Sequence, residues 1–156
     1  MTRPYMEDRF AAEPMLGKLV KWLRMMGYDA LYRQSYREED FIRLRAEGRR
    51  LLSRRKEAQA LHPEVILIRS DYVGEQLKEM RNLGCLKLDR KKFFTRCLRC
   101  NTPLQEADPE AARSSLPDHV YHENLSGIRF CTHCGRFFWA GTHRDRMLKQ
   151  LADWGL

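Results

Sequence analysis

The chain has 156 residues, of which 29 are Lys or Arg and 21 are Asp or Glu, so its formal net charge is +8. With 43% hydrophobic and 32% charged residues, it can bury one core of ordinary size with a small appendage, which excludes long-range disorder and two full-sized domains. No apolar run approaches the ~18 residues of a membrane span, and the N-terminus lacks a signal-peptide pattern. We therefore expect a cytoplasmic protein without a membrane partner. The basic excess points first to a polyanion such as nucleic acid, with solubilising charge as the alternative.

The first part of the chain, residues 1–92, alternates predicted strands and helices. Residues 9–12 form the first predicted strand, followed by a helix over 14–26 with Pro14 in its first turn and Gly27 at its end. Apolar patterns predict further strands at 30–32, 50–53 and 65–68, and further helices at 38–47, 56–61 and 71–82. The alternation predicts the α/β class, with a mainly parallel sheet flanked by helices. Sites in such sheets form beyond the carboxyl ends of the strands.

A charged linker leads into a second module, residues 93–156, that holds most of the cysteines. Four of them form two C-x-x-C pairs, Cys97 with Cys100 and Cys131 with Cys134. In a cytosolic chain two such pairs predict four thiolate ligands of a structural Zn²⁺ rather than a redox-active pair. The fifth cysteine, Cys85, is expected to be a buried small hydrophobe.

The surroundings of the cysteine pairs are typical of a zinc ribbon. Asn101 and Gly135 directly follow the pairs and tolerate the left-handed backbone expected after a metal knuckle. The 30 residues between the pairs exceed the usual spacing, so an inserted loop is expected at about 109–117. The expected ribbon core consists of Phe130, Phe137, Phe138 and Trp139. A last amphipathic helix is predicted, with capping-box spacing at 142–145.

Positive charge concentrates in the first module, which has 21 basic and 14 acidic residues against 8 and 7 in the second. Seven cations and only one acid, Glu47, lie between residues 43 and 56. This run is either a solvated helix face or a phosphate-binding surface, and its arginines suit bidentate phosphate contacts. With two lysines of the first helix added, the predicted RNA-binding residues are Lys18, Lys21, Arg43, Arg49, Arg50, Arg54 and Arg55.

Carboxylates also gather near the predicted strand ends. Glu13 follows the first strand, Asp40 lies near the start of the second helix, and Asp71 follows the fourth strand. Acids at this edge of a sheet can hold Mg²⁺ or Mn²⁺, which need oxygen ligands and can activate water against a phosphodiester. Each acid taken singly is better explained as a favourable charge at a helix N-terminus. Only their shared placement favours a metal site.

Two blocks of the sequence match a known pattern. One is FAAEPMLGKLVKWLRMMGYD at 10–29, and the other is the pair RCLRCNTPL at 96–104 and CTHCGRFFWAGTHRDRM at 131–147. These blocks resemble the PIN-like ribonuclease family first described at the C-terminus of a mutator-class exonuclease, and the likeness runs from about residue 9 to 151. The resemblance implies a PIN-like α/β domain with a C-terminal zinc ribbon that acts on RNA with a divalent metal.

The chain departs from the pattern of this family where the metal is expected. The family has an Asp at the end of the first strand, where this chain has Glu13, and Asp40 matches the acid of the second helix. The family's Thr-Arg-Asp after the third strand aligns with Ser53-Arg54-Arg55, so that Arg55 replaces a metal-binding carboxylate. A guanidinium at this position would oppose Mg²⁺ and attract phosphate.

Three functional hypotheses follow. In the first, the protein is an RNA-binding, metal-dependent ribonuclease, a hydrolase in which Glu13 and Asp40, with Asp71 as a third ligand, hold Mg²⁺ or Mn²⁺. In the second, it is catalytically inactive because of Arg55 and binds RNA or a ribonucleoprotein, with the zinc ribbon as a docking module. In the third, it is an adaptor that binds only protein, and its arginines are merely solvated.

Overall fold

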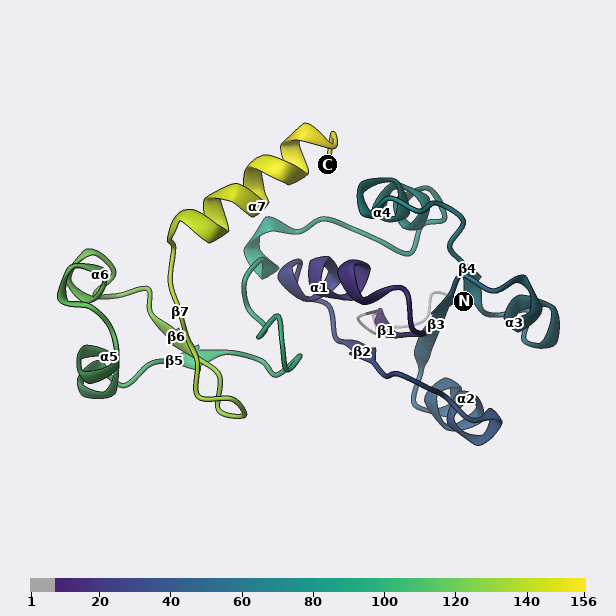
Figure 1. The fold of residues 1–156 in the computed structure, drawn as a ribbon, viewed down its shortest axis with the longest axis horizontal. Coiled ribbons are helices and arrows are strands. Elements are labelled where there is room, and N and C mark those ends of the chain that lie inside the picture. The colour runs from purple at the N-terminus through teal and green to yellow at the C-terminus, as the bar shows by residue number, and fades with distance from the viewer. Residues whose placement is uncertain (1–7) are drawn as a thin grey trace, which may run out of the picture. The chain divides into compact units, whose positions relative to one another are not determined.

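The computed structural model describes residues 8–156 of the chain (Figure 1). Residues 1–7, on which the expectation about a signal peptide partly rests, lie outside the described residues. In residues 8–156, no helix is both long and apolar enough to cross a membrane. The chain divides into two compact units, residues 1–101 and 102–156.

The first unit contains a four-stranded parallel sheet with the strand order β2-β1-β3-β4. Its strands are β1 (Arg9–Ala12), β2 (Ala30–Tyr32), β3 (Arg49–Ser53) and β4 (Ile66–Leu67). Its helices are α1 (Gly17–Met25), α2 (Glu38–Ala46), α3 (Lys56–Leu61) and α4 (Val73–Asn82), followed by the 3-10 turn η1 (Arg90–Lys92). The predicted α/β class, with a parallel sheet flanked by helices, is confirmed.

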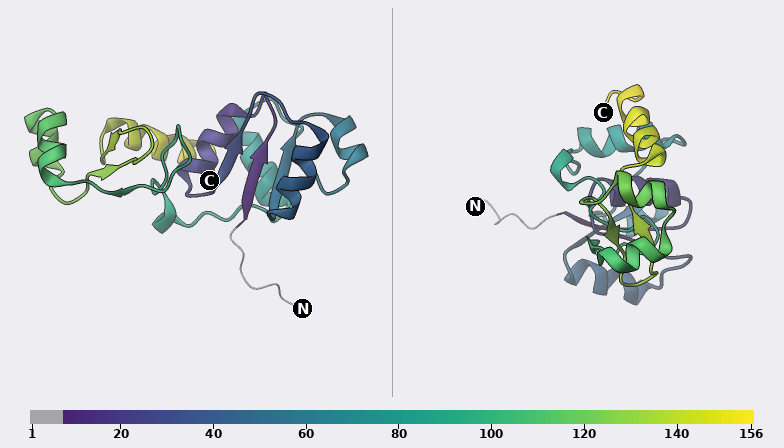
Figure 2. Two further views of the ribbon diagram at one scale, coloured as in Figure 1. Left: turned by 90° about the horizontal axis from the view of Figure 1, so that it is seen from below. Right: turned by 90° about the vertical axis from the view of Figure 1, so that its left-hand side faces the viewer.

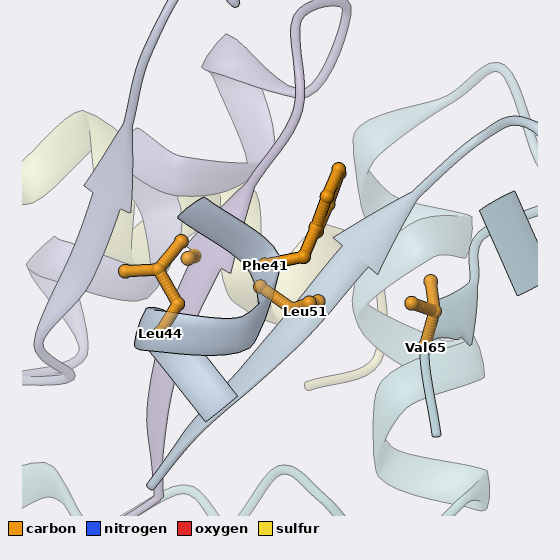
Figure 3. Close-up of a cluster of buried hydrophobic side chains, with 5 residues drawn as sticks. Phe41, Leu44, Leu51 and Val65 are labelled. Carbon is orange, nitrogen blue, oxygen red and sulfur yellow. The ribbon is translucent and has the colours of Figure 1, made fainter. Parts of the chain in front are cut away.

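Helices cover both faces of this sheet, with α1 and α4 on one face and α2 and α3 on the other (Figure 1). On the α2 face, Phe41 and Leu44 pack with Leu51 of β3 and with Val65 (Figure 3). Successive side chains of a strand point to opposite faces, so Leu52, the equally buried neighbour of Leu51, faces the other helix layer. Burial on both faces explains why the central residues of β1 and β3 are short apolar runs.

The start of α1 differs from the prediction. The helix begins at Gly17 rather than Pro14, because Met15 has a φ of 80° and cannot be helical. The Glu13 amide donates to the Leu52 carbonyl at 3.1 Å, and the residues that follow make a tight turn before the helix. This turn fixes Glu13 beside the end of β3.

The end of α1 agrees with the prediction. Gly27 has a φ of 95°, the left-handed conformation that glycine adopts at little cost. A Cβ atom at this position would lie 2.5 Å from the Lys92 carbonyl oxygen. Gly27 therefore both ends the helix and admits the close approach of the segment around Lys92.

The second unit contains an antiparallel sheet of three short strands, β5 (Gln105–Glu106), β6 (Arg129–Phe130) and β7 (Phe137–Phe138). The helix α7 (Thr142–Asp153) follows, and Met147 and Leu151 are buried. The rings of Phe130 and Phe137 pack with centroids 5.2 Å apart, as expected of a ribbon core, whereas Trp139 is exposed.

Two local predictions for the second unit were wrong. The insertion between the cysteine pairs is not a loop but two short helices, α5 (Pro109–Ser115) and α6 (Asp118–Glu123), drawn in green in Figure 2. The Asp108 carboxylate accepts a hydrogen bond from the Ala111 amide at 3.1 Å and caps α5. The capping box predicted at 142–145 is absent, because Gly141 takes the N-cap position and supplies no side chain.

Candidate functional site

The strand order places Glu13, Ser53 and Arg55 together at one edge of the sheet. In the sheet, β2 lies on one side of β1, and β3 and β4 lie on the other side. The direction in which successive strands are added therefore reverses between β1 and β3. Open α/β sheets bind ligands beyond the carboxyl ends of the strands at this point. Glu13 directly follows β1, Ser53 ends β3, and Arg55 lies two residues further on.

Both oxygens of the buried Glu13 carboxylate are hydrogen-bonded. Arg55 donates from Nη2 to Oε1 at 2.7 Å and from Nε to Oε2 at 3.0 Å, while the Ser53 hydroxyl donates to Oε2 at 2.5 Å. The two bonds from Arg55 form the planar fork that makes arginine–carboxylate pairs specific. The Ser53 hydroxyl oxygen in turn accepts from the Arg55 amide at 3.0 Å, which closes the network.

These contacts keep Glu13 ionised. Burial is the largest influence on the Glu13 pKa and raises it, but the hydrogen bonds from Arg55 and Ser53 and the charge of Arg55 together outweigh burial, so the pKa is lowered. The hydrogen bond and charge of Glu13 raise the pKa of Arg55. The pair is therefore a carboxylate and a guanidinium at neutral pH.

As they are arranged, the acidic residues do not fit a Mg²⁺ or Mn²⁺ centre. Such a centre needs free carboxylate oxygens that converge on one point, but both Glu13 oxygens are bonded to donors and a cation stands 2.7 Å from one of them. Among residues 8–156, the only group of three or more His, Cys, Asp or Glu side chains placed to share an ion consists of cysteines. The structure does not bring the three predicted catalytic acids together.

Asp40 is engaged at the start of its own helix. One carboxylate oxygen accepts a hydrogen bond from the Arg37 amide at 2.8 Å, and the other accepts from Arg43 Nη2 at 2.9 Å. The hydrogen bond from Arg37 is the main cause of a lowered Asp40 pKa, and the nearby arginines add to it. Asp40 thus stabilises the N-terminus of α2.

Asp71 lies in the loop after β4, and 79% of its side chain is exposed. It forms an ion pair with Arg54, whose Nη2 is 2.6 Å from Asp71 Oδ1. The acid that organises this loop is Glu79 of α4, because its carboxylate accepts hydrogen bonds from the Arg69 and Ser70 amides at 2.9 and 2.7 Å. No local pattern in the sequence distinguishes Glu79 from other acids on the exposed face of a helix.

The predicted RNA-binding residues do not form one continuous run of exposed cations. Arg49 lies at the amino end of β3, only 10% of its side chain is exposed, and it donates to both oxygens of Asp29 at 2.7 and 3.1 Å. Arg54 and Arg55 follow the opposite end of the same strand. A five-residue strand is about 16 Å long, so these cations belong to two edges of the sheet.

The other predicted RNA-binding residues are more exposed. Lys18 and Lys21 are exposed on α1. Arg43, also exposed, pairs with Asp40, and the half-buried Arg50 lies 3.8 Å from Asp8. Their roles in binding RNA stay predictions.

The first C-x-x-C loop is bound to the amino end of the sheet through contacts that the sequence did not predict. The Asn101 side chain accepts a hydrogen bond from the Ala30 amide at 3.0 Å and donates to Asp29 at 2.7 Å. Arg24 of α1 donates to the Leu98 and Arg99 carbonyls at 3.1 and 3.0 Å. The backbone between the two cysteines of this loop is therefore held by α1, the first helix of the unit.

The four cysteines form a group able to hold a metal ion. Cys97, Cys100, Cys131 and Cys134 place their sulfur atoms within 4.8 Å of one another. Four thiolates are the donor set of structural Zn²⁺ sites, in which sulfurs 2.3 Å from the ion are about 3.8 Å apart. Asn101 and Gly135, with φ of 66° and 74°, have the left-handed backbone predicted after each pair. The cysteines fit zinc, and Cys85 is buried as expected.

The protein is an α/β protein with a four-cysteine group. Its parallel sheet carries charged side chains at the strand ends, and the four cysteines can hold a metal ion. The sequence model of the family described as the Mut7-C RNAse domain matches residues 8–151. The chain belongs to this family, which confirms the resemblance and supports a ribonuclease-type function with RNA as substrate or partner. No curated protein and no solved structure matches the chain.

Proposed function

We propose that the protein binds RNA at the carboxyl ends of its parallel strands, and that the pair of Glu13 and Arg55 stands where its family would hold a catalytic metal ion. The single observation that carries this proposal is the two-bond contact of Arg55 with the buried Glu13 carboxylate. It supports RNA binding without metal-dependent hydrolysis, which was the second hypothesis from the sequence. In this proposal the cysteine-rich module, residues 93–156, serves for docking to RNA or to a ribonucleoprotein.

The exposed side of Arg55 supports a contact with phosphate. Its side chain is 60% exposed, and its two bonds to Glu13 use two of the five N–H donors of a guanidinium. The others can bind phosphate oxygens, for which a planar guanidinium is well suited. Glu13 would then orient Arg55 for its ligand.

Metal-dependent RNA hydrolysis is the second candidate function. Two observations favour it. Glu13 is ionised and lies where the strand order reverses, between β1 and β3. The Arg55 side chain is exposed, so it has room to move away from Glu13. In this case Glu13 would be a ligand of Mg²⁺ or Mn²⁺, whereas Asp40 and Asp71 would have to move to join it, because the structure does not place them beside Glu13. The two candidates differ in one observable property, which is RNA cleavage that depends on the added metal.

RNA binding is tested by fluorescence anisotropy with a labelled single-stranded 12-mer between 50 and 200 mM KCl. We expect the affinity to fall steeply with salt, because each phosphate contact with single-stranded RNA contributes about −0.7 to the slope of log K against log salt. Arg55→Gln should weaken binding and flatten the slope, whereas Arg90→Gln, which removes an exposed charge in η1, should not. Absence of binding at 50 mM KCl, or binding that is independent of salt, would contradict the proposal.

A further inference from the structure

A basic pocket lies beside the carboxyl ends of β3 and β4. Its volume is about 450 Å³, and it is lined by Arg54, Lys56, Leu67, Ile68 and Arg69. Three of these five residues are cations and none is an acid, while the other two are apolar. A volume in this range suits a small-molecule ligand, and the lining suits a ligand that carries both negative charge and an apolar part.

Two of the three cations of the pocket are available to a ligand. Lys56 and Arg69 are exposed, and neither forms an ion pair with another residue of the described part of the chain. Arg54 pairs with Asp71 and donates from Nη2 to the Arg69 carbonyl at 3.1 Å. Within residues 8–156, its buried Nε has no hydrogen-bond acceptor. Because this nitrogen is buried within the protein, a ligand in the pocket would contact Arg54 through its other N–H donors.

The wall of the pocket is held in place by the rest of the fold. The Ile68 amide donates to the Ser53 carbonyl at 2.8 Å, which ties the end of β4 to the end of β3. Glu79 accepts hydrogen bonds from the Arg69 and Ser70 amides, and the Gln76 side chain donates to the Ser70 carbonyl at 2.9 Å. A fixed wall reduces the ordering cost of binding.

We propose that this pocket binds one nucleotide unit of an RNA, with its phosphate against Arg54, Lys56 and Arg69. The RNA part of the ligand rests on the function proposed above. Leu67 offers apolar surface to the sugar or base, and the ring of Tyr72, in the same loop as Arg69, is 76% exposed and suited to stacking on a base. Arg55 adjoins Arg54 in the chain, so the pocket extends the proposed RNA contact from β3 toward β4.

The pocket itself is tested with adenosine 5′-monophosphate, titrated into the ¹⁵N-labelled full chain. We expect amide shifts to cluster at residues 54–56 and 67–70, and Arg69→Gln to weaken binding about tenfold, as expected for loss of a charged hydrogen bond. Lys56→Gln should act in the same direction. The matched controls Arg90→Gln and Lys91→Gln remove the same charges from η1 and should leave the affinity within twofold. Amide shifts centred on other residues, or equal losses of affinity in the control variants, would overturn the proposal that this pocket binds the nucleotide.

The same four variants are then compared in binding of the single-stranded 12-mer. Arg69→Gln should lower the salt slope by about 0.7, the contribution of one phosphate contact. If the unmodified protein binds RNA but Arg69→Gln and Lys56→Gln behave like their controls, the pocket proposal fails and the proposed function stands. If the unmodified protein does not bind RNA, the proposed function fails, and with it the RNA part of this proposal. The mononucleotide titration then decides whether the pocket binds a nucleotide at all.

Discussion

Arg55 bonds both oxygens of the Glu13 carboxylate, so these oxygens are not free to bind a metal ion. The resemblance to the family predicts a metal-binding carboxylate where this chain has Arg55, and this replacement stays a prediction. The sequence did not predict the pairing itself, because Glu13 and Arg55 are 42 residues apart and meet only through the register of β1 and β3. The bond between Glu13 and Ser53 depends on the same register.

Replacing Arg55 with Gln should raise the pKa of Glu13. The lowered pKa of Glu13 in the folded state means that its ionised form stabilises the fold above the unfolded-state pKa of about 4.3, and that this contribution is lost as pH falls through the folded-state pKa. Without Arg55, burial dominates and opposes ionisation. We expect Arg55→Gln to lower the free energy of unfolding by about 1–2 kcal/mol at pH 7, a value reduced for the exposure of Arg55.

The measurements are the pKa of Glu13 from its carboxyl ¹³C shift and urea unfolding at several pH values. The stability difference between the unmodified protein and Arg55→Gln should shrink as pH falls below about 4. Arg90→Gln serves as the control for loss of a positive charge. An unchanged Glu13 pKa in Arg55→Gln would show that the pair does not set the ionisation of this carboxyl.

At the scale of helices and strands, apolar periodicity located every helix and strand of residues 8–101 apart from η1, because both faces of the sheet are buried. The predicted boundaries failed where tertiary contacts decide them. The helix α1 starts late because the turn at Met15 holds Glu13 against β3. The helices α5 and α6 were missed because the long spacing between the cysteine pairs suggested a loop, although Asp108 and Pro109 are a good helix start.

The Asn101 side chain links the start of β2 to the first cysteine pair. Asn101→Ala removes the acceptor of the Ala30 amide and the bond to Asp29, and it places alanine in a left-handed conformation. We expect a loss of about 2–3 kcal/mol in the free energy of unfolding. Asn101→Gly should recover only the part of this free energy that comes from backbone strain, because glycine tolerates the left-handed conformation but supplies no side chain.

Chemical denaturation of the zinc-loaded protein measures both variants. Asn82→Ala, at the exposed end of α4, provides the matched control and should cost less than about 1 kcal/mol. If Asn101→Ala is no more destabilised than Asn82→Ala, the hydrogen bonds of Asn101 do not stabilise the fold.

At the scale of the whole molecule, the sequence predicted the parallel sheet, the cysteine group and the family. It did not predict that the arginine run is divided between the two edges of the sheet. Sequence proximity placed Arg49 with Arg54 and Arg55, but a strand carries its two ends to opposite edges. Of the arginine run, the cations that follow β3 therefore belong to the proposed RNA contact, and Arg49 does not.

The cysteine group predicts that the whole protein holds zinc. We expect about one zinc ion per molecule by elemental analysis, because the cysteine group offers four thiolates to one ion. Removal of zinc by a chelator, or Cys97→Ser, should lower the stability measurably, since metal binding contributes to folding free energy. Cys85→Ser should leave the zinc content unchanged. A zinc-free protein with unaltered stability would contradict a structural metal site.

We propose that Arg55 stands where a catalytic metal ion is expected beside Glu13, and RNA cleavage in Mn²⁺ tests this proposal. End-labelled single-stranded RNA is incubated with the protein with and without added Mn²⁺, without a chelator that would also remove zinc. Arg55→Asp, which restores the family's acid beside Glu13, serves as the comparison. We predict that the unmodified protein binds the RNA and leaves it intact in both conditions. Cleavage by the unmodified protein that requires Mn²⁺ and is lost in Glu13→Gln would show that Arg55 does not take the place of a catalytic metal ion.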